Sequence, residues 1–347
     1  MFLRMHALLV ASSGGHLVEL ESWSRRIAEI DKITWAAAET PQSKALLAGQ
    51  DVHWIPDIQP RQLRETMGLL GIARRIVQNE RVDVVVSTGA SVAVPFFVAA
   101  RMYGAEGHYL ESAARVDGPS ITGQVAAVMP KVRCYNQSEQ WADSRWKYAG
   151  SVFDGFAGRD VQPATGPLRV VVTVGSMHHP MTRMVEKLNS VLPDDAEVVW
   201  QLGHTPAIPN MKATRIEEFV SHDELTELMA EAHVVVCHAG VGSVLQAVSV
   251  GKSPILVPRR VEHGEHVDDH QVQIAGRLSE IGIATAVETD SLSTETIRAA
   301  ASRGTCRAES ASPLVLRSLR VAKPRASRPA SIVVTQPLTE SVVQRHA

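Results

Sequence analysis

The stretch His233–Ser243, HVVVCHAGVGS, joins a short apolar run to a turn with two glycines. The run is rich in valine and bounded by polar residues, which is typical of a strand buried in a parallel sheet. A helical pattern follows, so Gly240 and Gly242 let the backbone approach a ligand at a helix start, where the helix carries about half a positive charge. The stretch predicts a pyrophosphate site, with His238 and Ser243 beside the turn. The alternative is a turn in which Ser243 caps the helix and the glycines serve tight packing.

Strand and helix patterns alternate on both sides of this stretch. The second half has the strand-like runs RVVVTV, EVVWQL, ATRIEEF, SPILVP and GIATAV, with helical patterns from Met181, Asp223, Val241 and Asp268. The first half has HALLVA, ITWAAA, VHWI, VDVVVS, GHYLES and VRCYN, with helical patterns from Leu17 and over Arg61 to Asn79. We therefore expect an α/β fold of two Rossmann-like, doubly wound domains that face each other across a cleft.

Composition shifts mark the expected domain limits. Pro and Gly cluster in VQPATGP, residues 161–167, which indicates a linker between domains at 1–160 and 168–302. Residues 303–347 are rich in Ser, Pro and Arg, and we expect them to be mostly disordered. The sequence shows neither an export signal nor an apolar run of about 18 residues, so we expect no membrane span.

The overall charge and the cysteines narrow the class of protein. A formal net charge of -2 over 347 residues argues against a protein built mainly to coat nucleic acid. The three cysteines form no CxxC motif, which fits a reducing cytoplasm and supplies no metal or redox site.

A second glycine turn, SSGGH at residues 12–16, follows the first strand. Gly14 and Gly15 permit a tight turn whose free N–H groups can bind an anion. His16 lies at the mouth of this turn, and an imidazole, whose ordinary pKa is near neutrality, is a natural general base for a sugar hydroxyl. The alternative is a purely structural turn.

Charged and polar side chains also follow the strand SPILVP. Arg259 and Arg260 at its carboxyl end suit an anionic ligand. The segment EHGEHVDDHQ, residues 262–271, offers hydrogen-bonding groups for sugar hydroxyls, or else it is a solvated loop whose acids stabilise a helix start. Its histidine spacing matches no known metal-ligand pattern, so we expect no metal.

The helical pattern over Arg61–Val77 combines an apolar stripe with several arginines. Such a helix can lie against anionic lipid. The alternative is a surface helix whose apolar stripe packs against its own sheet.

Taken together, the motifs resemble family 28 glycosyltransferases of the GT-B fold. LLVASSGGHLVEL, DVVVSTGASVAVP and ESAARVDGPSITG resemble the membrane-recruiting subunit of the dolichol-linked chitobiose N-acetylglucosaminyltransferase. VVTVGSMHHP, HAGVGSVLQAVSVGKSPILVPR and DDHQ resemble its catalytic partner. The chain looks like a fusion of these two subunits, or of the bacterial polysaccharide glycosyltransferase pair of the same type, from about Ala7 to Ala300.

The resemblance implies inverting transfer of a sugar from a UDP-sugar to a polyprenyl-diphosphate-linked saccharide, without a metal or a separate cofactor. It also implies a cytoplasmic protein attached peripherally to the inner face of the membrane. It makes His16 the base and assigns acceptor binding to Gly14, Gly15, Glu111 and Arg115. The expected donor-binding residues are Gly175, Ser176, His238, Gly240, Gly242, Ser243, Gln246, Arg259, Asp269, His270 and Gln271. Gln246 stands where many relatives have a glutamate that binds the ribose diol, and an amide binds a diol less strongly.

Two other functions stay open at this point. A UDP-sugar 2-epimerase has two similar domains, and it would change a UDP-sugar without any acceptor. A noncatalytic recruiting scaffold would bind no UDP. The donated sugar, the acceptor and the oligomeric state do not follow from the sequence.

Overall fold

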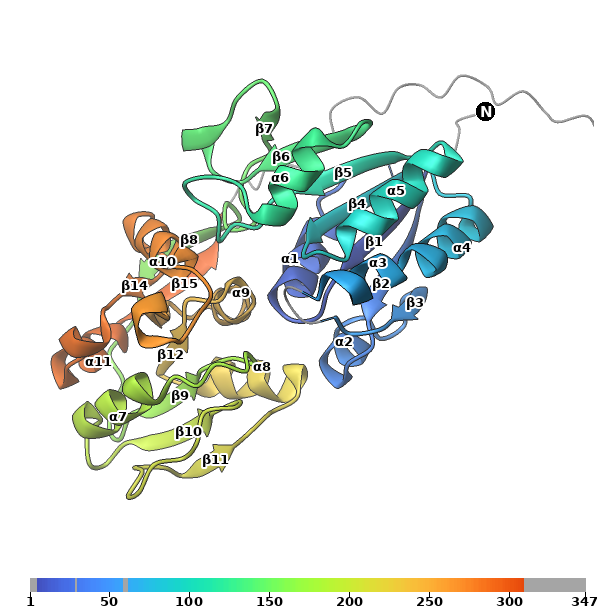
Figure 1. The fold of residues 1–347 in the computed structure, drawn as a ribbon. Coiled ribbons are helices and arrows are strands. Elements are labelled where there is room, and N and C mark those ends of the chain that lie inside the picture. Colours follow the sequence, from blue (N-terminus) through green and yellow to red (C-terminus); the bar gives the residue numbers. More distant parts are fainter. Residues whose placement is uncertain (1–4, 29, 59–61, 309–347) are drawn as a thin grey trace, which may run out of the picture. The chain divides into compact units, whose positions relative to one another are not determined.

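The computed structural model describes residues 5–28, 30–58 and 62–308 (Figure 1). The strands of the first sheet are β1 (His6–Ala11), β2 (Lys32–Ala38), β3 (Val52–Ile55), β4 (Val84–Gly89), β5 (Glu106–Leu110), β6 (Val132–Asn136) and β7 (Trp146–Tyr148). The accompanying helices are α1 (Gly15–Ser24), α2 (Pro41–Leu46), α3 (Leu63–Gly68), α4 (Leu70–Glu80), α5 (Ala93–Tyr103), α6 (Ile121–Val128) and the short η1 (Glu139–Trp141). All neighbouring strands are parallel, in the order β3-β2-β1-β4-β5-β6-β7.

The second sheet repeats this plan. Its strands are β9 (Arg169–Thr173), β10 (Glu197–Gln201), β11 (Arg215–Glu217), β12 (Val234–His238), β13 (Ile255–Val257) and β14 (Thr285–Ala286). Its helices are α7 (Thr182–Val191), α8 (His222–Glu231), α9 (Val241–Ser249), α10 (His270–Glu280) and α11 (Thr294–Ala300), with short η2 (Val261–His263) and η3 (Thr289–Ser291). The strands are again parallel, in the order β11-β10-β9-β12-β13-β14. The prediction of two doubly wound parallel sheets is confirmed.

The strand order places the two glycine turns. In each sheet the first strand along the chain lies inside the sheet. β1 lies between β2 and β4, and β9 lies between β10 and β12, so the chain proceeds outward on one side and then on the other. Open α/β sheets bind ligands at the carboxyl ends of the strands beside this switch point. The turn at residues 12–16 follows β1, and the turn at residues 238–243 follows β12, the neighbour of β9. Both turns therefore lie at the ligand-binding edges of their sheets.

Each half has its own apolar core. Phe96 and Phe97 of α5 pack in a cluster drawn from the first half. Trp200, Met184 and Leu188 are fully buried in a cluster drawn from the second. The valine-rich strands are buried on both faces, which accounts for their continuous apolar runs.

Two predictions about individual segments need correction. β15 (Arg303–Arg307) pairs antiparallel with β8 (Phe156–Asp160), so residues 303–307 are part of a sheet and do not belong to a disordered tail. The rest of that predicted tail, from residue 309, lies outside the described residues. The single helix expected over Arg61–Asn79 is two helices, α3 and α4, that meet at Leu69. The exact domain limits stay a prediction.

The apolar stripe of α4 settles one of the alternatives above. Ala73, Ile76 and Val77 are buried in the core of the first half. This stripe therefore packs on its own domain. This was the alternative given above to a helix that lies against lipid. None of the helices in the described ranges has the length and apolar character needed to span a bilayer.

Candidate active site

The two predicted glycine turns touch each other. α1 packs against α9, and a Cβ atom placed on Gly242 would lie 3.2 Å from the Cα of Gly15. Both helices begin without a side-chain cap, with Gly14 and Gly240 at the N-cap positions. Their first N–H groups therefore lack intrahelical partners, and two partly positive helix ends adjoin. A diphosphate at this junction would offset their mutual repulsion.

His16, the predicted base, lies at the start of α1 beside this junction. Its ring packs so closely on Gly89 that a Cβ there would lie 3.2 Å from Cε1, and Thr88 Oγ1 donates a hydrogen bond to its carbonyl at 2.8 Å. Burial, with a smaller contribution from the positive charge of Arg115, lowers the pKa of His16 to about 4. The imidazole is therefore neutral near pH 7, the form a general base requires.

The ring of His238 packs against the backbone of the second turn. His238 ends β12 and is 7% exposed, and Cβ atoms on Gly175 or Gly240 would each come within 2.3 Å of its ring. Glycine is thus required at both positions by the space that the imidazole occupies. Burial, followed by the charge of Arg259, lowers the pKa of His238 to about 3, so the ring is neutral.

Arg115 of the first half forms an ion pair with Asp268 of the second half. Asp268 is not among the site residues predicted from the sequence. The Nη2 atom of Arg115 donates to Oδ2 of Asp268 at 2.6 Å, and Oδ1 of Asp268 is hydrogen-bonded to Nδ1 of His270. His270, followed by Arg115, holds the pKa of Asp268 well below its usual range. The only signal in the sequence was its place beside Asp269 in the polar segment.

His266 completes this cluster. The ligand-type atoms of His266, Asp268 and His270 lie within 4.8 Å of one another, a spacing that could hold a metal ion. Hydrogen bonds account for the grouping equally well, because Nδ1 of His266 accepts from the Asp268 N–H at 3.3 Å and Asp268 pairs with Arg115. The expectation of a metal-free site stays a prediction.

Glu111, predicted to bind the acceptor, is hydrogen-bonded within the first half, and its role toward the acceptor stays a prediction. It is 1% exposed, and its carboxylate accepts hydrogen bonds from the hydroxyl of Tyr109 at 3.1 Å, the N–H and hydroxyl of Ser120 at 2.9 and 3.0 Å, and the N–H of Ser112 at 3.2 Å. A buried carboxylate needs such partners. Glu111 therefore holds the loop that carries Arg115.

Glu19 joins the same loop to the helix that begins with His16. This fully buried residue of α1 accepts hydrogen bonds from Ser112 Oγ at 2.8 Å, from the N–H of Ala113 at 2.7 Å and from the side chain of Gln137. Burial raises its pKa to about 7. Sequence patterns gave no sign of it, because it stands on a helix face that looked ordinary.

Replacing Glu19 by Gln should remove a pH dependence of stability. The folded protein holds the Glu19 proton up to about pH 7, whereas the unfolded chain releases it near its ordinary pKa. The free energy of unfolding should therefore fall by about 3 kcal/mol as pH rises from below 4.5 to above 7. Urea denaturation at pH 5 and pH 8 should show a smaller difference in Glu19→Gln than in the wild type. The exposed Glu65→Gln serves as the control, and an equal difference in all three proteins would contradict the assignment.

Two of the predicted donor-binding side chains, Arg259 and Gln271, are buried and hydrogen-bonded within the protein. Arg259, which we expected to bind an anion, is 0% exposed and donates to the carbonyl oxygens of His179, Val174 and Glu265. Gln271 is also buried, and its Oε1 accepts from the N–H of Arg259 at 3.1 Å. Both side chains are engaged within the protein in this structure, and their direct contact with the donor stays a prediction. A buried guanidinium needs acceptors around it, and backbone carbonyls supply them here.

Gln246 is likewise occupied. Its Nε2 donates to the carbonyl of His222 and to Thr226 Oγ1, both at 2.8 Å. Its amide nitrogen is therefore not free for a ribose diol. Of the remaining donor positions, Ser176, Gly240, Gly242, Ser243, Asp269 and His270 are at least partly accessible. The donor-binding roles of all these positions, and of Gly175 and His238, stay predictions.

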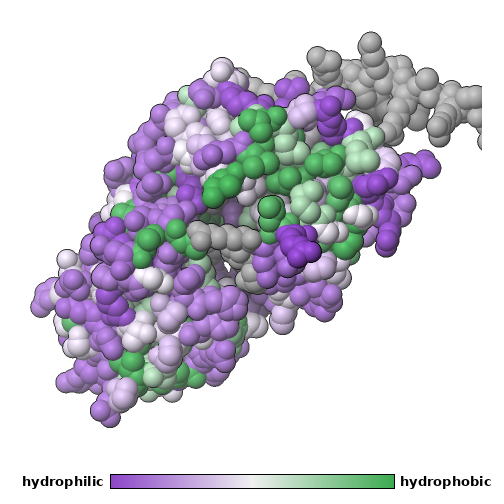
Figure 2. All heavy atoms as spheres, in the orientation of Figure 1, coloured by the Kyte–Doolittle hydropathy of each residue, from purple (hydrophilic) through white to green (hydrophobic). Residues whose placement is uncertain are grey.

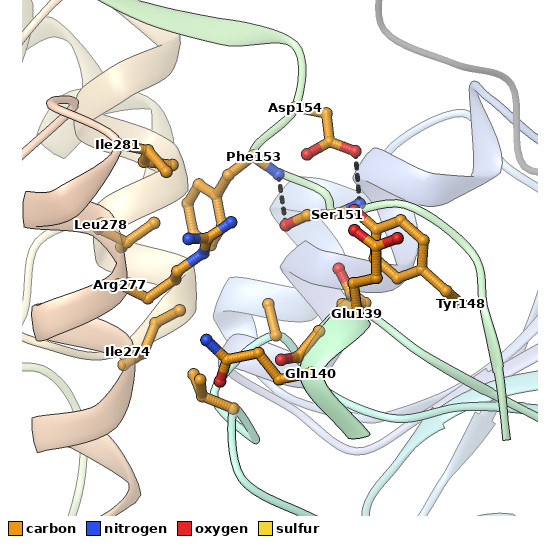
Figure 3. A pocket seen from close by; sticks show the side chains of 14 residues that line it. Glu139, Gln140, Tyr148, Ser151, Phe153, Asp154, Ile274, Arg277, Leu278 and Ile281 are labelled. Atoms are coloured by element: carbon orange, nitrogen blue, oxygen red, sulfur yellow. Dashed lines mark hydrogen bonds between the residues drawn. The ribbon is translucent and has the colours of Figure 1, made fainter. Parts of the chain in front are cut away.

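A cavity of about 300 Å³ lies elsewhere, between α10 and loops of the first half (Figure 3). Ile274 and Leu278 of α10, Ile281 directly after it and Phe153 of the first half contribute apolar surface. Glu139 and Asp154 contribute carboxylates. None of the predicted site residues lines this cavity.

Comparisons with known proteins show which proteins this chain resembles. Residues 169–316 match the model of the glycosyltransferase family 28 C-terminal domain. The chain is therefore a UDP-sugar-dependent glycosyltransferase that resembles family 28, and the recognition made from the sequence motifs is confirmed.

Relatives of two kinds match. The UDP-N-acetylglucosamine--N-acetylmuramyl-(pentapeptide) pyrophosphoryl-undecaprenol N-acetylglucosamine transferase of Synechococcus sp. is 26% identical over 294 residues, covering 77% of this chain and 80% of that protein. The UDP-N-acetylglucosamine transferase subunit ALG13 of Yarrowia lipolytica is 41% identical over 63 residues, covering 18% of this chain and 30% of that protein. The crystal structure of Acinetobacter baumannii MurG matches with a TM-score of 0.53 at 18% identity, covering 86% of this chain and 89% of that chain, which confirms the GT-B fold.

Proposed function

We propose that this protein transfers a sugar, with inversion, from a UDP-sugar to a saccharide carried on a lipid diphosphate. The observation that carries the proposal is the contact between the turn at Gly15 and the turn at Gly242. It places a neutral imidazole, His16, beside two uncapped helix starts. A hydroxyl deprotonated at His16 could then attack a sugar whose diphosphate leaves toward the start of α9.

The residues near the two turns have different roles in the proposed reaction. The first N–H groups of α9 would bind the departing diphosphate and stabilise its charge without a metal. The accessible side chains of Ser243, Asp269 and His270 would contact the donor. Arg115 adds a positive charge from the first half. N-acetylglucosamine is the first sugar to test, because the names of both relatives contain it.

A transfer assay tests the proposal. The purified full chain is given a panel of UDP-sugars, including UDP-N-acetylglucosamine, with a short polyprenyl-diphosphate saccharide. We expect a glycosylated lipid whose new linkage, read by NMR, has the opposite anomeric configuration to the donor, with and without EDTA. A UDP-sugar converted to its 2-epimer in the absence of acceptor would replace this function with an epimerase. Absence of UDP binding in calorimetry would leave a recruiting scaffold.

We also propose that the first half contacts a membrane surface through an apolar patch on α3 and α6. The patch comprises Leu63, Met67, Ile121, Val125 and Val128, of which Ile121 is 78% and Val128 82% exposed. Figure 2 shows apolar surface gathered over the region where α3, α5 and α6 lie in Figure 1. Exposed apolar clusters of this kind mark interaction sites.

Basic residues flank the patch. Arg64 on α3, Arg101 on α5 and Lys131 after α6 are all exposed. Apolar insertion combined with cationic neighbours favours an anionic lipid surface. This arrangement would place the protein at the inner face of the membrane.

The double substitution Ile121→Glu and Val128→Glu should weaken membrane binding. Two carboxylates in the patch oppose both apolar insertion and attraction to anionic lipid, so we expect at least a tenfold loss of affinity for vesicles that contain phosphatidylglycerol. Vesicle sedimentation measures the change, and UDP binding should not alter. Ile216→Glu, on an exposed residue of β11, is the matched control. Equal sedimentation of all three proteins would remove the patch from this role.

A further inference from the structure

Asp268 is the carboxylate on which side chains from both halves of the protein meet. Its Oδ2 binds Arg115 of the first half at 2.6 Å, and its Oδ1 binds Nδ1 of His270 at the start of α10. The side chains of Arg115 and Asp268 are 26% and 36% exposed. Solvent therefore weakens their attraction, and the pair acts on geometry more than on stability.

Arg115 is held firmly on the side of the first half. Its carbonyl accepts a hydrogen bond from Trp141 Nε1 at 3.1 Å, and its N–H donates to the carbonyl of Ser112 at 2.9 Å. The hydroxyl of Ser112 donates in turn to Glu19, on the helix that begins with His16. The ion pair to Asp268 thus connects the helix of His16 to the start of α10.

The same carboxylate fixes the proton of His270. An ionised carboxylate can only accept, so the facing Nδ1 of His270 must carry the hydrogen. In the neutral ring, Nε2 is then left with a lone pair. His270 is the first residue of α10, between Asp269 and Gln271 of the expected donor segment, and its side chain is 18% exposed. A lone pair there can accept a hydrogen bond from a sugar hydroxyl.

We propose that Asp268 is a positioning residue for sugar transfer, which joins the two halves through Arg115 and holds His270 as an acceptor for a hydroxyl of the bound sugar. The inference rests on the proposed function and names a residue and a proton position within that site. It also explains why a carboxylate, and not an amide, stands at this position.

Asp268→Asn tests the proposal, because it keeps the size of the side chain while it removes the negative charge and changes the hydrogen bonding. Arg115 has only donors, so it will take the amide oxygen, and the amide NH₂ will face Nδ1 of His270. The proton of His270 must then move to Nε2, where it can no longer accept from a hydroxyl. We expect kcat for the proposed transfer to fall at least tenfold, while the Kd for UDP changes less than threefold.

Two readouts separate positioning from simple damage to the fold. Nitrogen-15 NMR of histidine-labelled protein, assigned with His270→Gln, should show the proton on Nδ1 in the wild type and on Nε2 in Asp268→Asn. Glu224→Gln is the matched control, since Arg215 binds Glu224 at the same 2.6 Å with 39% and 42% exposure within one half. It should leave kcat and the imidazole spectrum unchanged.

The outcomes are distinct. Retention of the Nδ1 proton in Asp268→Asn, or an unchanged kcat, would overturn the role of Asp268. A wild-type protein that transfers no sugar would overturn the proposed function, while the NMR comparison would still decide whether Asp268 fixes the ring. Asp268→Asn could lower the melting temperature by more than the control does. In that case Asp268→Ala gives a second NMR test, because it removes the oxygen that accepts from Nδ1 of His270.

Discussion

Replacing His16 by Ala should lower turnover about a hundredfold or more if it removes the acceptor proton in the transfer step. The ring lies at the start of α1, beside the contact between the two glycine turns. Its carbonyl, which binds Thr88, is unaffected by the substitution. The measurement is kcat with saturating donor and acceptor, together with the melting temperature. His16→Gln, which keeps most of the volume, should be almost as inactive.

The pH profile gives a second check on His16. Because burial lowers its pKa to about 4, the ring stays in the basic form over most of the acid range. In the wild type, the acid limb of kcat/KM should therefore lie near pH 4 and not near 6.5, the value of a free imidazole. Near-normal turnover of His16→Ala at pH 7 would assign the base to another residue.

Gly240→Ala should lower the affinity for UDP by at least tenfold. Gly240 has φ -81°, which alanine adopts without strain, so the only conflict is steric. The added Cβ would come within 2.3 Å of the His238 ring. The buried ring must move, and the turn at the start of α9 must move with it. Overpacking of this kind typically costs about 1–3 kcal/mol of stability. Calorimetry with UDP and thermal unfolding measure the two effects.

A double substitution isolates the steric cause. In a His238→Ala background the ring is gone, so Gly240→Ala should add almost no further loss of stability, and the two effects should be clearly non-additive. Gly276→Ala, at a helical glycine whose Cβ would meet no atom within 4 Å, is the control. Unchanged UDP affinity in Gly240→Ala would show that the turn does not bind the nucleotide diphosphate.

The fold was largely readable from the sequence because its strands are buried on both faces. Runs such as VVVCH at β12 are continuous and apolar, and the glycines after them mark the turns. β8 and β15 escaped notice for the opposite reason. Their sequences, FAGRD and RGTCR, are short and polar, and each is stabilised mainly by pairing with the other. Local pattern carries no information about a partner so far along the chain.

The site could be predicted only in part. Backbone features such as the two glycine turns follow from residue type, and their meeting follows from the position of each turn at a sheet edge. The direction in which a side chain points does not follow from residue type. Arg259 and Gln271 stand in the expected segment, yet both are buried and hydrogen-bonded within the protein. Asp268 and Asp269 are adjacent, but only the first reaches Arg115, whereas the second accepts from the N–H of Val261 in its own half.

The antiparallel pairing of β8 with β15 has a consequence for cutting the chain into two fragments. β8 precedes residues 161–167, and β15 comes from the end of the described chain, so a cut within 161–167 would place these strands on separate polypeptides. Each fragment would keep its own parallel sheet, and an antiparallel strand pair, together with the packing of α1 on α9, would hold the fragments together. A split enzyme made in this way should reassemble from its two pieces without any designed tether.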